Sequence, residues 1–137
     1  MTPRTESLVL GGLDVVRVGA VGRARPASLL FVHGMWGGAW VWERWLPFFA
    51  ARGWDGYALN LRGRAGSRSV ADVGRVPLAD YVEDAAAVAR CLGEVVVVGH
   101  SMGGLVAQAL AATLDPIAVV AVTPAAPRGR CAARLWS

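Results

Sequence analysis

Apolar runs of strand length alternate along the chain with longer segments of helical period. The first two runs, residues 7–10 and 13–18, meet at the glycine pair Gly11 and Gly12 and predict an N-terminal hairpin or meander. Four later runs are uncharged or nearly so and are bounded by Gly or Pro, which is typical of buried strands. These runs are residues 28–34, 56–63, 95–99 and 117–124.

Three helical patterns lie between these runs. They cover residues 40–53, 78–93 and 102–114, and the first two end on a glycine. Residues 64–76 are rich in Gly, Ser and Arg and predict a loop. Alternating strands and helices indicate the α/β class, with a mostly parallel sheet that carries helices on both faces.

Length and composition indicate one apolar domain. The chain has 137 residues, of which 55% are hydrophobic, and its mean hydropathy is +0.43. In such an apolar chain, either the core is tightly packed or some of the segments that would cover the apolar surface are missing. All 14 basic residues are arginines, and they are scattered along the sequence. A nucleic-acid partner is not expected, because such a partner requires basic residues clustered on one face.

The cysteines and the apolar segments bear on metal binding and location. Cys91 and Cys131 are far apart without CxxC spacing, which favours free thiols over a disulfide framework or a zinc site. Residues 1–12 lack a signal-peptide pattern, so we expect a cytoplasmic protein. Glycines divide the long uncharged stretch 95–114 into a strand and a helix, so we expect buried core and no membrane association.

The stretch Gly99-His100-Ser101-Met102-Gly103 fits the pattern G-x-S-x-G between a predicted strand and a predicted helix. A serine on such a sharp turn has strained backbone angles, and the flanking glycines let strand and helix approach closely. Ser101 is therefore the candidate nucleophile. A solvated serine in a glycine-rich turn is the plain alternative. A dinucleotide fingerprint is a further alternative, which the glycine spacing and the lack of an acidic residue about 20 positions later disfavour, and a phosphate-binding loop would need a lysine.

A second motif supplies candidates for an oxyanion hole. His33 and Gly34 end a predicted strand, and the loop after them is placed to aim a backbone N–H at a developing oxyanion. The second donor in such sites is the N–H of the residue after the nucleophile. Met35 and Met102 are the candidates. For His33 we favour a hydrogen bond that orients the loop over a direct chemical role.

Four segments in order, HGMWGGAWVW, LNLRG, DYVEDAAAV and VVVVGHSMGG, resemble the α/β-hydrolase fold superfamily over residues 8–127. The first is similar to the branch of plant-type methyl esterases and hydroxynitrile lyases. The resemblance implies a small-molecule ester or acyl substrate, acylation of Ser101 and no cofactor or metal. Arg64 stands where many relatives carry histidine, and we expect this departure to affect only local bonding in its loop.

The same resemblance implies a triad in the chain order Ser, then Asp or Glu, then His. The two histidines, His33 and His100, both precede Ser101, and the only later carboxylate is Asp115. We therefore predict a partial, truncated hydrolase domain over residues 1–127, inactive by itself, and an irregular tail over residues 128–137. The alternatives are a non-catalytic protein that binds a small ligand in the same pocket, or a truncated reading frame without independent function.

The strand predicted at residues 117–124 carries no charge, and we expect it to form an exposed edge of the sheet. Unpaired backbone groups on such an edge favour edge-to-edge self-association.

Overall fold

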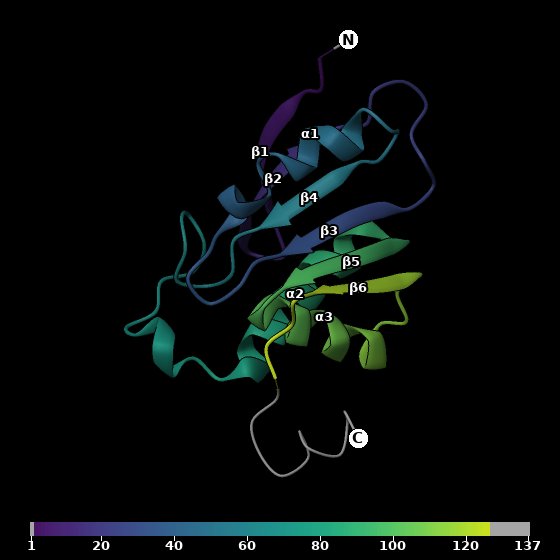
Figure 1. Cartoon of the computed structure of the whole chain (residues 1–137). Helices are drawn as coiled ribbons and strands as arrows, with labels where there is room; N and C mark the ends of the chain where they lie inside the picture. Colours follow the sequence, from purple (N-terminus) through teal and green to yellow (C-terminus); the bar gives the residue numbers. More distant parts are fainter. Residues whose placement is uncertain (1, 127–137) are drawn as a thin grey trace.

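A computed structural model describes residues 2–126; the predicted tail, with Cys131, lies outside these residues. The described chain forms one six-stranded sheet with the strand order β1-β2-β4-β3-β5-β6 (Figure 1). The elements are β1 (Thr5–Leu10), β2 (Leu13–Val18), β3 (Ser28–Val32), the 3₁₀ helix η1 (Ala39–Trp42), α1 (Trp45–Ala50), β4 (Gly56–Leu59), the 3₁₀ helix η2 (Val73–Arg75), α2 (Leu78–Leu92), β5 (Val95–His100), α3 (Met102–Thr113) and β6 (Ala118–Val122).

The sheet is mixed at one end and parallel over the rest. The predicted hairpin is confirmed: β1 and β2 pair antiparallel, and Gly11 and Gly12 between them both have positive φ, 57° and 77°. Tight hairpins favour glycine there because both turn residues need positive φ. Strand β2 then pairs antiparallel with β4, whereas the pairs β4–β3, β3–β5 and β5–β6 are all parallel. The carboxyl ends of β3 and β5 therefore lie side by side.

Helices cover both faces of the sheet, as predicted (Figure 1). On one face, α2 and α3 bury inward-facing strand residues such as Leu30 and Val97. On the other face, η1 and α1 cover Phe31, whose ring lies 4.9 Å from that of the buried Trp42, centroid to centroid. Alternation along each strand sends neighbouring residues to opposite faces, which is why runs such as 95–98 are apolar throughout.

The single helix predicted over residues 40–53 is wrong. The segment instead forms η1, a turn at Glu43 and Arg44, and the six-residue α1. Pro47 explains the break: it has no N–H to donate to the carbonyl four residues earlier, that of Glu43, and its ring would clash with that carbonyl in a continuous α-helix. A proline is tolerated only in the first turn, which is where Pro47 lies in α1.

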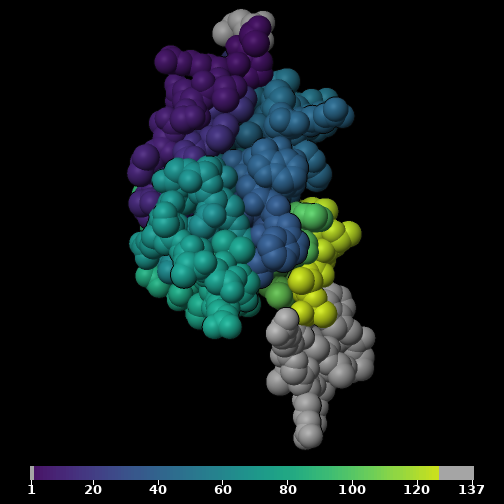
Figure 2. Space-filling model, turned by 90° about the vertical axis from the view of Figure 1, so that its left-hand side faces the viewer, coloured from purple at the N-terminus to yellow at the C-terminus, as the bar shows by residue number. Residues whose placement is uncertain are grey.

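In the part of the chain that the structure describes, strand β6 ends the sheet and pairs only with β5. Ile117 and Val120 are exposed there, and Figure 2 shows the last described residues, in yellow, at the margin of the molecule. The expected self-association through this edge stays a prediction. The uncharged stretch 95–114 divides into β5 and α3. Within residues 2–126, no helix combines the length and the apolar character needed to cross a bilayer.

Candidate active site

Ser101 lies between the end of β5 and the start of α3, on a turn with φ of 55° and ψ of −121°. This is the strained conformation expected from the sequence, and a side-chain-bearing residue persists there only where its surroundings hold it. Two backbone hydrogen bonds to residues in and after β6 hold Ser101 in this conformation. The N–H of Ser101 donates to the carbonyl of Val122 at 3.2 Å, and the N–H of Ala125 donates to the carbonyl of Ser101 at 3.0 Å.

Gly99 and Gly103 bring three elements into backbone contact around this turn. A Cβ on Gly99 would lie 2.0 Å from the carbonyl oxygen of Gly103, and a Cβ on Gly103 would lie 2.1 Å from the carbonyl oxygen of Val32. No side chain fits at either position. The two glycines therefore let α3 lie directly against β5 and against the end of β3, which places Ser101 beside the loop that follows β3.

Gly34 brings that loop against the nucleophile. A Cβ on Gly34 would lie 3.2 Å from Cβ of Ser101 and 3.7 Å from its Oγ. The two motifs that the sequence places 67 positions apart thus meet at the carboxyl ends of the neighbouring strands β3 and β5. Ligand sites in open α/β sheets lie at this edge.

Met35 lies in the loop after β3 and lines the cavity beside Ser101, and Met102 directly follows Ser101 at the start of α3. Within residues 2–126, the N–H of Met35 has no hydrogen-bond acceptor. Met102 is the first residue of α3, where a helical N–H has no partner inside the helix. The positive end of the helix dipole adds to the attraction for negative charge. Both donors are thus available to a ligand beside Ser101, and their service as an oxyanion hole stays a prediction.

His33 orients the peptide that carries the N–H of Met35. Its Nε2 accepts from the N–H of Leu61 at 3.1 Å, so the ring proton is on Nδ1, which donates to the carbonyl of Gly34 at 2.6 Å. The Gly34 carbonyl and the Met35 N–H belong to one planar peptide group and point in opposite directions. The bond from His33 therefore sets the direction of the Met35 N–H. Burial lowers the pKa of His33 to about 4, and the guanidinium of Arg64 acts in the same direction.

We expect the stability of the protein to fall as the pH is lowered from 6.5 toward 4. Over this range an unfolded His33 binds a proton while the folded one, with its pKa near 4, does not. The unfolded state then holds more protons, so the unfolding free energy decreases on acidification, by about 3 kcal/mol at most. Urea unfolding followed by circular dichroism at several pH values measures the slope.

The matched variant for this measurement is His33→Asn, which has no titrating group. Carboxylates also titrate near pH 4, so the quantity of interest is the difference in slope between the two proteins. We expect the variant to be less stable at pH 7 but to lose less stability on acidification. Equal slopes would show that His33 is protonated in the folded state.

Arg64 reaches the same loop from the other side. Its Nη2 donates to the carbonyl oxygen of Met35 and lies 3.6 Å from the Met35 Sδ, while Nη1 donates to the carbonyl of Arg62 and the hydroxyl of Tyr81, at 2.8 and 2.9 Å. The expectation that Arg64 affects only its own loop is therefore wrong, because a long side chain spans the gap between this loop and the one after β3.

A buried ion pair fixes the segment from which Arg64 projects. Asp84 of α2 accepts from the Nε and Nη2 of Arg62, at 3.0 and 2.8 Å, and from the Arg62 N–H at 3.1 Å. This pair was not predicted from the sequence. A signal for it exists: Asp84 lies on the face of α2 that carries the buried Tyr81 and Val88. A carboxylate on an apolar helix face needs a charged or hydrogen-bonding partner.

Ser101 opens into a mostly apolar cavity of about 510 Å³. Its lining residues are Gly34, Met35, Trp36, Gly37, Trp40, Val41, His100 and Ser101. Two tryptophans in this lining are largely exposed, Trp36 at 82% and Trp40 at 67%. Their positions were not singled out from the sequence, although the tryptophans that closely follow His33 and Gly34 offered a signal.

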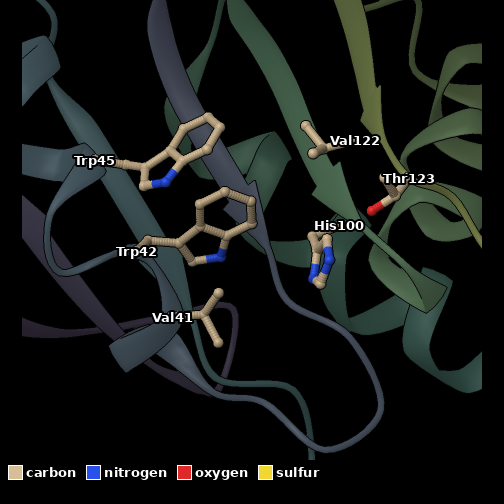
Figure 3. A pocket seen from close by; sticks show the side chains of 6 residues that line it. All are labelled: Val41, Trp42, Trp45, His100, Val122 and Thr123. Atoms are coloured by element: carbon tan, nitrogen blue, oxygen red, sulfur yellow. The ribbon is translucent and has the colours of Figure 1, made fainter.

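A second, smaller cavity of about 250 Å³ adjoins the first and shares Val41 and His100 with it (Figure 3). Trp42, Trp45, Val122 and Thr123 complete its lining, so η1, α1, β5 and β6 all contribute. His100 faces this cavity, opposite the indole of Trp42 (Figure 3). The loop after β3 and the residues after β6 are both visible on the same face of the molecule (Figure 2).

No residue among the described ones is positioned to accept the proton of Ser101. Within residues 2–126, the Ser101 hydroxyl has no hydrogen bond to either histidine. Both ring nitrogens of His33 are engaged by backbone, as described above. Asp115 is exposed and precedes β6, so it lies at the end of the sheet opposite to Ser101.

Comparisons with solved structures show the same fold. TT1662 from Thermus thermophilus is 27% identical with a TM-score of 0.73, and the match covers 99% of this chain and 67% of that one. The epoxide hydrolase VrEH1 from Vigna radiata is 21% identical with a TM-score of 0.73, covering 95% and 41%. The thioesterase domain from the curacin biosynthetic pathway is 21% identical with a TM-score of 0.73, covering 99% and 52%.

The chain thus spans between two fifths and two thirds of the length of these three proteins. No curated protein matches the sequence at a significant level. The family model described as "Alpha/beta hydrolase family" matches residues 29–137, which include the loop after β3, the Ser101 turn and all the parallel strands but the first residue of β3. By this match and by its fold, the chain belongs to the alpha/beta hydrolase family.

Proposed function

We propose that Ser101 is the nucleophile of an acyl-transfer site for small carboxylic esters. The observation that carries this proposal is the contact between the two motifs: the strained Ser101 turn lies against Gly34, next to Met35 and Met102, whose N–H groups have no acceptor among the described residues. Acyl transfer needs a nucleophile with neighbouring N–H groups that can stabilise the developing oxyanion.

The chemistry follows from these positions. The Ser101 Oγ attacks the carbonyl carbon of the ester and loses its proton to solvent water, since no described residue is positioned as the base, while the carbonyl oxygen becomes an oxyanion. That oxyanion accepts hydrogen bonds from the N–H groups of Met35 and Met102. When the carbonyl bond re-forms, the bond to the alkoxy oxygen breaks and the alcohol leaves with a proton, so Ser101 carries the acyl group as an ester.

The substrate class rests on the nucleophile and on the cavity. Similar structures include epoxide hydrolases and a thioesterase domain. A hydroxyl nucleophile backed by two oxyanion donors favours a carbonyl carbon over an epoxide carbon, because the charge to be stabilised develops on a carbonyl oxygen. A cavity of about 510 Å³ with tryptophan walls suits a small apolar ester. The similarity of residues 33–42 to plant-type methyl esterases supports the same class.

Within residues 2–126 no histidine is hydrogen-bonded to the Ser101 hydroxyl, which limits the turnover expected of these residues alone. Triad sites that lose the base still accelerate the reaction roughly 10³- to 10⁴-fold over the rate in water. This remaining rate enhancement comes from oxyanion stabilisation and substrate binding. We therefore propose slow acylation of Ser101 without efficient hydrolysis. The same observation favours a second candidate, a non-catalytic protein that holds a small ester or acid in this cavity.

We expect a fluorophosphonate to label the folded chain at Ser101 alone. The phosphonyl oxygen occupies the place of the oxyanion, so the reagent reports on the nucleophile and both donors together. Mass spectrometry of the digested protein locates the adduct. Ser101→Ala should abolish the labelling, and so should unfolding in urea, because the unfolded serine lacks the donors. The exposed Ser69 serves as an internal control for indiscriminate reaction.

Two results would contradict acyl transfer. Equal labelling of Ser69 and Ser101 would show an unactivated hydroxyl. No labelling of Ser101, together with quenching of tryptophan fluorescence by p-nitrophenyl butyrate, would favour the binding protein instead.

A further inference from the structure

We propose that Arg64 is a positioning residue that holds the oxyanion loop, defined as residues 34–38, in its productive conformation. This inference rests on the proposed acyl-transfer function. It concerns a residue that touches neither Ser101 nor the place of the substrate's carbonyl, and that acts through the backbone of Met35.

The guanidinium of Arg64 joins three segments of the chain. Its Nη2 donates to the Met35 carbonyl in the oxyanion loop, 29 positions earlier in the sequence. Its Nη1 donates to the carbonyl of Arg62 at 2.8 Å and to the hydroxyl of Tyr81 at 2.9 Å. A planar guanidinium offers donors in a fixed fork and can hold several acceptors at once, which a lysine ammonium on a flexible stem does less well.

Arg64 is itself held by α2. The carbon at the centre of its guanidinium lies 5.1 Å from the ring centroid of Tyr81, a cation–π contact. Tyr81 is fully buried, and its hydroxyl donates to the carbonyl of Val73 at 3.0 Å, which leaves the oxygen lone pairs for Arg64. The position of the guanidinium is therefore set both by its own loop, through the carbonyl of Arg62, and by Tyr81 of the 15-residue helix α2.

The two peptide groups that flank Met35 are thus held from two different sides. His33 holds the carbonyl of Gly34, in the peptide whose N–H belongs to Met35, and Arg64 holds the carbonyl of Met35, in the next peptide. Fixing both planes fixes φ and ψ of Met35 between them. Neither contact alone does so, because rotation about the Met35 Cα would leave one plane free.

The oxyanion loop needs such restraint because of its composition. Three of its five residues are glycines, Gly34, Gly37 and Gly38, and glycine has the largest conformational freedom to lose. One internal bond, from the N–H of Gly37 to the carbonyl of Gly34 at 3.2 Å, closes the turn. Oxyanion donors contribute most when they are already aligned before reaction, so an anchor outside the loop raises the rate without touching the substrate.

The test compares fluorophosphonate labelling of Ser101 in the full chain and in three variants. Arg64→Met keeps the length and apolar stem of the side chain but removes the donors, and we expect the limiting rate of labelling to fall about tenfold with the half-saturating concentration unchanged. Arg64→Lys keeps the charge, and we expect it to recover less than half of the loss. Arg75→Met removes an exposed arginine of η2 and should leave the rate unchanged.

Amide hydrogen exchange of residues 35–41 gives a second readout that does not depend on labelling. We expect Arg64→Met to speed exchange of the Gly37 amide about tenfold, without a matching change in β5, because loop opening becomes independent of global unfolding. Arg75→Met should change neither. A merely structural role of Arg64 would instead speed exchange in β5 as well.

The outcomes separate the two proposals. If the unaltered chain is not labelled at Ser101, the proposed function fails, and the exchange of Gly37 still decides whether Arg64 restrains the loop. If the unaltered chain is labelled and Arg64→Met reacts at the same rate, the positioning role is overturned. Full recovery of the labelling rate by Arg64→Lys would overturn it too. The positive charge, and not the planar set of guanidinium donors, would then account for the effect of Arg64.

Discussion

Replacing Gly103 by alanine is expected to leave most of the protein unfolded. Alanine normally stabilises a helix over glycine by about 1 kcal/mol. Here the new Cβ would lie 2.1 Å from the carbonyl oxygen of Val32 and 2.5 Å from that of His33, both of them backbone atoms. Neither carbonyl moves without breaking the contact between α3 and β3, so the loss should exceed about 4 kcal/mol and approach the roughly 5 kcal/mol that a marginally stable domain possesses.

Urea unfolding followed by far-ultraviolet circular dichroism measures this loss. Gly99→Ala should behave alike, because its Cβ would meet the carbonyl of Gly103 at 2.0 Å. Gly74→Ala is the matched control: its nearest neighbour is the carboxylate of Asp72 at 3.2 Å, an exposed side chain that caps η2 and needs to shift by only a few tenths of an ångström. A Gly103→Ala protein within about 1 kcal/mol of the unaltered one would contradict the close packing of the Ser101 turn.

Replacing Asp84 by alanine is expected to reduce the unfolding free energy by about 3 to 5 kcal/mol. Asp84 is only 4% exposed and accepts three hydrogen bonds from Arg62, one of them from its backbone N–H. The pKa of Arg62 is raised by its hydrogen bonds to Asp84, so the guanidinium keeps its charge. Without Asp84, a charged group and an N–H would be left with poor compensation in the interior.

Asp80 provides a control on the same arginine. Its carboxylate lies 3.4 Å from Nη1 of Arg62 but its side chain is 41% exposed, so Asp80→Ala should change the unfolding free energy by less than about 1 kcal/mol. The double variant Arg62→Met with Asp84→Leu removes both charges and should recover part of the loss of Asp84→Ala. Thermal and urea unfolding of the four proteins test this order; equal effects of Asp80→Ala and Asp84→Ala would contradict it.

The fold was predictable because its strands and helices are encoded by local patterns. Runs of apolar residues bounded by glycine or proline marked each strand, and the pair Gly11 and Gly12 marked the hairpin. The failure at residues 40–53 also has a local cause, since Pro47 in the middle of an apolar run was given too little weight. Periodicity reports which face is buried, but a proline decides where a helix begins.

The candidate site was predictable only where backbone geometry restricts the residue type. The spacing of Gly99, Ser101 and Gly103 follows from contacts that exclude any side chain, so it is visible in the sequence. The link between Arg64 and Met35 is different, because it depends on how far two loops stand apart after the strands have paired. No local pattern encodes that separation.

The main-chain contacts at Gly99 and Gly103 also bear on how such a site can be modified. They set the spacing between the Ser101 turn and the end of β3 through atoms that every residue possesses. Side-chain replacements elsewhere therefore cannot adjust that spacing in small steps; they can only keep it or destroy it. The adjustable part is the cavity wall, where Trp36 and Trp40 are exposed and make room for other side chains. A library that randomises Trp40, which lies outside residues 34–38, would thus alter the cavity wall and leave the Ser101 turn unchanged, whereas one that includes the two glycines would mostly yield unfolded protein.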